Sequence, residues 1–154
     1  MTDVRRLRAA AGRLRAAVAE LDPTRLTGAD PATGEQWESG QVLSHCAEMI
    51  PYWVGQIDTL VAVGGDAPFG RVKSDPDRIE RIAAGRAADP DRLLGTIDAG
   101  VESVETLLAR LSPADLELVG HHSTLGSMTV TKIVEEFLID HLEQHADQLE
   151  SLRG

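Results

Sequence analysis

Residues 129–149 read TVTKIVEEFLIDHLEQHADQL, and this stretch carries the strongest signal in the chain for both fold and chemistry. Ile133 and Phe137 precede His141 at steps of four residues, and His145 follows it at the same step. Residues four apart share one face of an α-helix. The spacing therefore predicts a helix that presents two imidazoles on the same stripe as its core-facing apolar side chains.

Three further stretches have apolar residues at alternating spacings of three and four, which is typical of amphipathic helices. The four predicted helices run from Thr2 or Asp3 to about Leu21, from Ser39 to about Val63, from Pro90 to Leu111, and from a cap at Thr129 to about Leu152. Four long amphipathic helices predict an all-α four-helix bundle. The length suits one core, so we expect residues 1–154 to form a single domain.

The connection between the second and third predicted helices is expected to be long. Residues 64–74 read as a loop, and Asp75 followed by Pro76 favours the start of a short helix that ends near Ala88. With so long a connection, the second and third helices need not be antiparallel neighbours. Aromatic residues make up only 3% of the chain and no apolar alternation occurs, so we expect almost no strand structure.

Pro51 falls inside the second predicted helix, where proline cannot donate the usual backbone hydrogen bond. Two alternatives stay open from the sequence. The helix is either kinked at this point or divided into two shorter helices.

Charge and hydropathy exclude several classes of partner. The chain has 15 basic and 25 acidic side chains, and its net charge of -10 would repel nucleic acids and anionic membranes. No apolar run approaches the roughly 18 residues of a membrane span, and the Arg-rich start lacks a secretory apolar core. The single cysteine, Cys46, cannot form an internal disulfide and is expected to be a small buried residue. We therefore expect a cytoplasmic protein.

A third histidine, His45, lies between Val42 and Met49 on the apolar stripe of the second helix. Three imidazoles that converge from two helices need partners, because an unpaired buried polar group costs roughly 1 to 3 kcal/mol. One divalent metal would satisfy all three, so His45, His141 and His145 are the predicted ligands. The alternative for each is a hydrogen bond to a carbonyl or carboxylate in the core.

Two familiar metal sites are excluded by neighbouring residues. A di-iron bundle needs Glu three residues before its ligand histidines, where this chain has Val42, Leu138 and Leu142. The HExxH motif of zinc proteases needs Glu directly after the first histidine, where Leu142 stands.

Other residues near the predicted ligands have two interpretations each. Glu48, three residues after His45, is either a solvated helix residue or a hydrogen-bond partner of a metal ligand. The side chains that either line a pocket or pack in the core are Met49, Tyr52, Trp53 and Phe137. Trp37 is expected to anchor the loop before the second helix, and His121 and His122 to be exposed in a loop. No catalytic residue is assigned.

The segments WESGQVLSHCAEMIPYW (37–53) and LGSMTVTKIVEEFLIDHLEQHADQL (125–149) resemble the DinB superfamily of metal-binding four-helix bundles. That superfamily includes thiol-dependent transferases and the N-terminal domain of mycothiol-dependent maleylpyruvate isomerase. The resemblance covers nearly the whole chain in helix order and implies metal ligation by His45, His141 and His145. One departure is that members often carry Asp directly after the first histidine of the last helix, whereas here Asp140 precedes His141. The chain ends soon after the last helix, so the isomerase activity itself is not expected.

Three histidines leave a fourth metal position open, which is typical of a catalytic site. The resemblance implies that a low-molecular-weight thiol such as mycothiol fills it and that its thiolate attacks a small-molecule substrate, in S-transfer or isomerisation. Bacillithiol, glutathione and a metal-dependent hydrolysis stay open. Zinc is the expected metal, with nickel next, because imidazole suits both.

Two hypotheses in which the protein is not an enzyme also stay open. One is a metal- or ligand-binding bundle that dimerises, as related bundles often do, and the other is a structural domain without a metal.

Overall fold

The long helices begin where the sequence supplies a cap. In the computed structural model, which describes residues 3–153, the Asp3 carboxylate accepts a hydrogen bond from Arg5 N and Thr129 Oγ1 accepts one from Lys132 N. These bonds satisfy backbone N–H groups that lack a partner within the helix. The helices are α1 (Val4–Val18), α2 (Ser39–Ala62), α4 (Pro90–Arg110), and a last one that runs through α6 (Val130–Ile133), a π-helical stretch η2 (Val134–Asp140) and α7 (His141–Glu150). The predicted four-helix bundle is confirmed.

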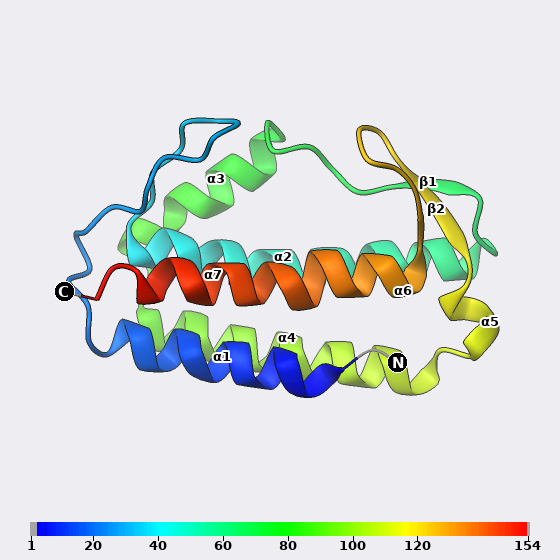
Figure 1. Ribbon diagram of the computed structural model, residues 1–154, viewed down its shortest axis with the longest axis horizontal. Coiled ribbons are helices and arrows are strands. Elements are labelled where there is room, and N and C mark those ends of the chain that lie inside the picture. The colour runs from blue at the N-terminus through cyan, green and yellow to red at the C-terminus, as the bar shows by residue number, and fades with distance from the viewer. Residues whose placement is uncertain (1–2, 154) are drawn as a thin grey trace.

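Helices that pack together in this bundle are not always consecutive in the chain (Figure 1). α1 packs against α4 and α7, and α2 packs against the same two helices. α2 and α4 run in one direction, and α1 and α7 run in the other. Because parallel neighbours cannot be joined by a short turn, the chain crosses back along the bundle between α2 and α4. The expected long connection is therefore confirmed, and it contains β1 (Ala67–Phe69), α3 (Pro76–Ala84) and a 3-10 turn, η1 (Gly85–Ala87).

The apolar stripes meet in a buried core of mostly aliphatic side chains. Its fully buried members include Leu7, Leu14, Leu43, Met49, Ile50, Ile57, Ile97, Leu107 and Leu138. Leu108, near the end of α4, and Leu111, directly after it, are only partly buried. Helix α1 ends at Val18 rather than Leu21.

Helix α2 is the longest helix, with 24 residues, and continues through Pro51 without interruption. The alternative in which proline divides it is therefore wrong. Between residues 3 and 153, no helix combines the length and the apolarity needed to cross a lipid bilayer.

Two glycines hold the crossover segment against the bundle. Gly40 lies in α2 and Gly85 begins η1, and a methyl group built on either would overlap the carbonyl oxygen of the other. The two backbones can approach this closely only because neither residue has a Cβ. This contact fixes the end of α3 on the α2 surface.

Replacing Gly85 with alanine is expected to destabilise the protein by about 1 to 3 kcal/mol, because the added methyl forces two packed backbones apart. Gly95→Ala is the matched control, since a methyl at Gly95, inside α4, would meet no neighbouring atom. It should instead stabilise the helix by about 0.5 to 1 kcal/mol. Urea unfolding of both variants measures the difference, and a Gly85→Ala protein as stable as wild type would contradict the close contact.

The expectation of almost no strand structure is wrong at one end of the bundle. There β1 pairs in parallel with β2 (Val119–His122), and β2 pairs antiparallel with β3 (Gly126–Thr129). Strands of three or four residues are too short for a period-two pattern to be recognised. A Cβ at Gly120 would overlap the side chains of Phe69 and Leu60, so glycine favours the close approach of β2 to α2 at that position.

Candidate metal centre

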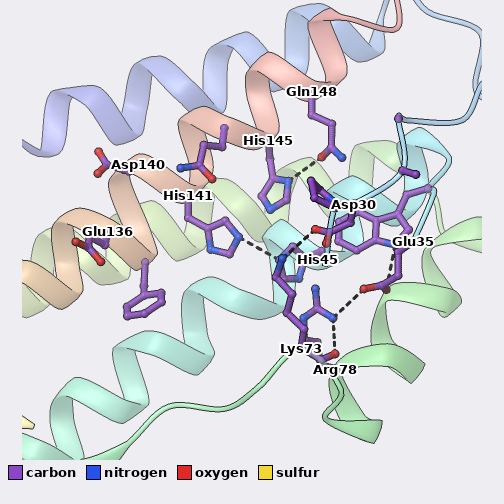
Figure 2. Close-up of a pocket in the computed structure, with 16 residues that line it drawn as sticks. Asp30, Glu35, His45, Lys73, Arg78, Glu136, Asp140, His141, His145 and Gln148 are labelled. Atoms are coloured by element: carbon purple, nitrogen blue, oxygen red, sulfur yellow. Dashed lines mark hydrogen bonds and ion pairs between the residues drawn. The ribbon is translucent and has the colours of Figure 1, made fainter. Parts of the chain in front are cut away.

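Three histidine side chains meet between α2 and α7 (Figure 2). One ring nitrogen each from His45, His141 and His145 lies within 4.8 Å of the other two. Their ring centroids are 4.7 to 5.2 Å apart. His45 and His145 are 2% and 8% exposed, whereas His141 is partly exposed. The fold thus brings together the three residues that the sequence predicts as ligands.

Hydrogen bonds on the outer side of the cluster orient two of these rings. His45 Nδ1 lies 3.1 Å from Glu48 Oε1, and His145 Nδ1 lies 2.9 Å from Gln148 Oε1. A ring whose Nδ1–H donates outward presents an unprotonated Nε2 inward. His45 Nε2 and His141 Nε2 face each other at 3.5 Å. His45 and His145 therefore offer Nε2 to a shared ligand, and Nε2 of His141 faces that of His45, although Nδ1 of His141 is also buried without a partner among the described residues.

Glu48 is a hydrogen-bond partner of His45 rather than a solvated helix residue. Its side chain is only 8% exposed, and the oxygen that accepts from His45 also pairs with the Arg71 guanidinium. The Arg71 guanidinium in turn lies over the Tyr52 ring, 4.1 Å from its centroid. A carboxylate fixed in this way holds the tautomer and the orientation of an imidazole.

Burial keeps the cluster uncharged. Removal from water lowers the pKa of His45 and His141 well below the usual 6.5, and neighbouring positive charges lower both further. For His145 the same desolvation lowers the pKa to about 4, although the bond to Gln148 opposes it. At neutral pH all three imidazoles are neutral, which is the form that binds a metal ion.

The π-helical stretch η2 ends directly before His141. A π-helical stretch inserts extra residues into the turns of an α-helix and is frequent at functional sites. The sequence predicts an α-helix throughout this segment, because the four-residue spacing of its apolar residues does not reveal such an insertion.

The inner nitrogens provide the test of whether a metal fits this site. His145 Nε2 is buried and has no hydrogen-bond partner among the described residues. A buried imidazole nitrogen without a partner is costly in the folded state. A divalent ion among the three Nε2 atoms would remove that cost, and neutral imidazoles suit zinc, nickel and copper. The donor set therefore fits a divalent metal.

A cavity of about 690 Å³ opens over the cluster. Its wall contains the three histidines together with Gly28, Ala29, Asp30, Pro31, Glu35, Trp37, Lys73, Arg78, Glu136, Phe137, Asp140, Gln144 and Gln148. These residues come from the last helix, the loop before α2, the start of α3 and the segment that precedes it. The volume is in the range of small-molecule sites.

Comparison with known families identifies the family of this chain. A sequence model of the DinB superfamily matches residues 6–149, which is nearly the whole chain. The chain belongs to the DinB superfamily. A search of curated protein sequences finds no significant match.

Two solved structures share this DinB fold. YfiT from Bacillus subtilis, described as a probable metal-dependent hydrolase with an unusual four-helix bundle topology, aligns with a TM-score of 0.75 at 17% identity. That alignment covers 97% of this chain and 82% of YfiT. The mycothiol-dependent maleylpyruvate isomerase aligns with a TM-score of 0.62 at 13% identity, and this chain spans only 59% of its length. Identities this low establish the fold alone.

In this DinB chain, one of the four expected pocket residues lines the cavity. Phe137 does so and stacks on Trp53, with ring centroids 4.2 Å apart. Met49 and Trp53 are buried in the core, and Tyr52 lies beneath Arg71. Helical spacing alone does not distinguish a residue that faces the core from one that faces a cavity a third of a turn away.

Trp37 does more than anchor a loop. Its backbone exchanges hydrogen bonds with Thr27, as expected for an anchor. Its ring also lies on the cavity wall, with its centroid 5.4 Å from that of His45 and 6.0 Å from that of His145. The indole therefore forms part of the candidate site.

None of the charged residues of the cavity wall was predicted from the sequence, and four of them lie outside the last helix. Asp30, Glu35, Lys73 and Arg78 lie in or beside loops that carry no periodic pattern. Lys73 pairs with Asp30 at 2.9 Å, and Arg78 pairs with Glu35 at 3.5 Å. The sequence offered one signal, because the Asp75 cap places Arg78 in the first turn of α3.

The histidines of the sheet do not join the metal cluster. His121 is exposed, as predicted, and bonds to Asp66 and Ser127. His122 is buried, so the prediction of an exposed loop residue is wrong for it. Its Nδ1 accepts from Leu125 N, and its Nε2 donates to the Arg71 carbonyl. His122 therefore ties the hairpin to the segment that carries Arg71.

Cys46 is fully buried, as predicted. Burial raises the pKa of its thiol far above neutrality. It does not act as a thiolate at neutral pH.

Proposed function

We propose that His45, His141 and His145 hold one divalent metal ion and that the protein is a metal-dependent enzyme acting on a small molecule in the adjoining cavity. The observation that carries this proposal is the buried, unpartnered Nε2 of His145, which lies in a cluster of three neutral imidazoles. Leaving such a group without a partner costs about 1 to 3 kcal/mol. A fold that tolerates this cost at the wall of a 690 Å³ cavity is best explained by a ligand that the three nitrogens share.

Zinc is the proposed metal, with nickel next. Three protein ligands leave a fourth position open, and a divalent ion there lowers the pKa of a thiol or water that it binds. The cavity adjoins the histidines, so an occupant of that position would face it.

The favoured reaction is transfer or isomerisation by a low-molecular-weight thiol, mycothiol being one candidate. Support comes from the cavity carboxylates, because each already pairs with a cation: Asp30 with Lys73, Glu35 with Arg78, Glu136 with Lys132, and Asp140 with Arg6. Hydrolysis usually needs a free general base. A thiol depends less on a general base, because its own pKa lies near 8.5.

Metal-dependent hydrolysis is the second candidate. It is favoured by the alignment with YfiT, which covers more of both chains than the isomerase alignment does. A further alternative is a non-catalytic bundle that binds a metal or small ligand and dimerises. Its net charge of -10 disfavours nucleic acid as a partner in any of these cases.

The test compares zinc-loaded wild type with its metal-free form. Each is mixed with mycothiol, bacillithiol or glutathione and a chlorodinitrobenzene electrophile, and thioether formation is followed spectroscopically. Metal-dependent turnover with a thiol supports transfer, whereas metal-dependent cleavage of an activated amide without thiol supports hydrolysis. If neither occurs and the loaded protein only dimerises, the enzyme proposal fails.

Glu48→Gln is expected to weaken zinc binding by about 10- to 100-fold, because the neutral amide makes His45 a weaker ligand. Glu102→Gln, on the exposed side of α4, is the control and should bind as wild type does. Competition with a fluorescent zinc chelator measures both. Equal affinities for the two variants would mean that Glu48 does not support the ligand.

A further inference from the structure

Arg78 is a buried arginine whose hydrogen-bonding capacity is only partly used. The residue is 6% exposed, and its Nη1 donates to the Lys73 carbonyl at 2.7 Å and to Glu35 Oε1 at 3.5 Å. A guanidinium has five N–H groups. Among the described residues, neither Nε nor Nη2 of Arg78 has a hydrogen-bond partner. These two nitrogens form the edge through which arginine binds a carboxylate with two parallel hydrogen bonds.

Arg78 belongs to the wall of the histidine cavity. Figure 2 shows its guanidinium on the side of the cavity near His45. Its Cζ lies 5.8 Å from the centroid of the Trp37 ring, which also neighbours His45 and His145. Because the Gly40–Gly85 contact fixes α3 on α2, the distance between Arg78 and the histidines is set by the fold.

The carboxylates of the cavity leave the Nε–Nη2 edge of Arg78 unpaired. Of the cavity carboxylates, Asp30, Glu136 and Asp140 are paired with Lys73, Lys132 and Arg6 respectively. Glu35 is the only one that faces Arg78, and it is shared, because its other oxygen accepts from Trp37 Nε1 at 3.3 Å.

We propose that the Nε–Nη2 edge of Arg78 binds the carboxylate of a small organic acid whose reacting end lies at the three histidines. This inference rests on the proposed function, and it assigns the substrate class of that same site. A carboxylate accepts two parallel N–H bonds from arginine, a geometry that lysine cannot reproduce. Fixing one end of the acid in this way orients its other end toward the histidines. The carboxylate belongs either to the electrophile or to the thiol.

The experiment measures binding of small carboxylates by calorimetry, in metal-free and in zinc-loaded protein. The probes are succinate with its uncharged analogue succinamide, and 3-mercaptopropionate with 3-mercaptopropanol. The variants are Arg78→Gln and Arg78→Lys, with Arg81→Gln as the matched control because Arg81 is an exposed arginine on the same helix. Zinc content and thermal unfolding are measured for every variant, so that loss of fold is not taken for loss of a site.

The expected result is that wild type and Arg81→Gln bind the carboxylates more tightly than the uncharged analogues. Arg78→Gln should bind them about 10- to 100-fold more weakly at unchanged zinc content. Arg78→Lys should recover only part of that loss. A penalty seen with succinate assigns the carboxylate to the electrophile, and one confined to 3-mercaptopropionate assigns it to the thiol.

Equal carboxylate binding by wild type and Arg78→Gln would overturn the inference and leave the metal proposal intact. Failure of wild type to bind zinc would instead overturn the proposed function. The metal-free measurements would then still decide whether Arg78 holds a carboxylate. The two failures are therefore distinguishable.

Discussion

Replacing His141 with alanine is expected to abolish stoichiometric metal binding. Wild type purified without a tag, added metal or chelator should retain about one equivalent of zinc or nickel, because three imidazoles converge within 4.8 Å. With His141 removed, only His45 and His145 remain. The loss of affinity should exceed the roughly 10- to 100-fold typical of a residue that merely supports a ligand. Inductively coupled plasma mass spectrometry measures the metal directly.

The matched control is His121→Ala. His121 is exposed on β2 and does not join the cluster, so its loss should leave the metal content unchanged. If wild type holds no metal even after reconstitution, the three histidines do not form a metal site. If His121→Ala and His141→Ala lose metal equally, binding is non-specific.

The second large effect is expected when the metal-free protein is acidified. The pKa of each buried histidine is lowered in the folded state, so between pH 6.5 and about 4 the unfolded chain binds protons that the folded chain does not. Stability should therefore be insensitive to these groups above pH 6.5 and fall as the pH drops below it. The slope should approach about 1.4 kcal/mol per pH unit for each histidine.

Urea unfolding of the metal-free protein at a series of pH values measures this slope. In His145→Leu the fall between pH 6.5 and 4 should be smaller by the contribution of one histidine, because leucine cannot take up a proton. Carboxylates whose pKa is lowered in the folded state, such as Asp30 and Glu105, also begin to contribute below about pH 5. Because both proteins contain them, the difference in slope between the variant and wild type isolates the histidine. A variant with the same slope as wild type would show that His145 is not buried in its neutral form.

The proposed carboxylate site and the metal site depend on different parts of the chain. Arg78 is placed by α3 and the crossover, whereas the histidines are placed by α2 and α7. Gly85→Ala disturbs the contact that positions α3 on α2, whereas none of the atoms nearest to the added methyl belongs to α7, which carries two of the three histidines. Carboxylate binding should therefore be more sensitive than zinc binding to this substitution.

The long helices and the candidate metal ligands of this protein can be predicted from helical periodicity. The four-residue steps from Ile133 to His145 place two imidazoles on the core face of the last helix, and His45 sits on the core face of α2. Because a helix repeats every 3.6 residues whatever it packs against, such stripes can be recognised without the fold. The same reasoning predicted four long helices, the long connection and the buried position of Cys46.

The sheet, the π-helical stretch and the charged residues of the cavity wall could not be recognised in this way. β1 pairs with a strand about fifty residues further along the chain, and Lys73, Arg78, Asp30 and Glu35 come from segments without a repeating pattern. The partners of Glu48 and His122 likewise come from the crossover, through Arg71.

The amino-acid sequence by itself thus determined the helices and which of their faces are buried, including the three histidines as candidate ligands. Only the tertiary structure decided that α2 and α4 lie parallel, that the loops close over the histidines, and that a buried arginine faces them. The physical reason is the separation along the sequence between the residues that interact. Helix formation and amphipathicity depend on residues three and four apart, whereas a cavity depends on contacts between segments that the chain brings together only when it folds.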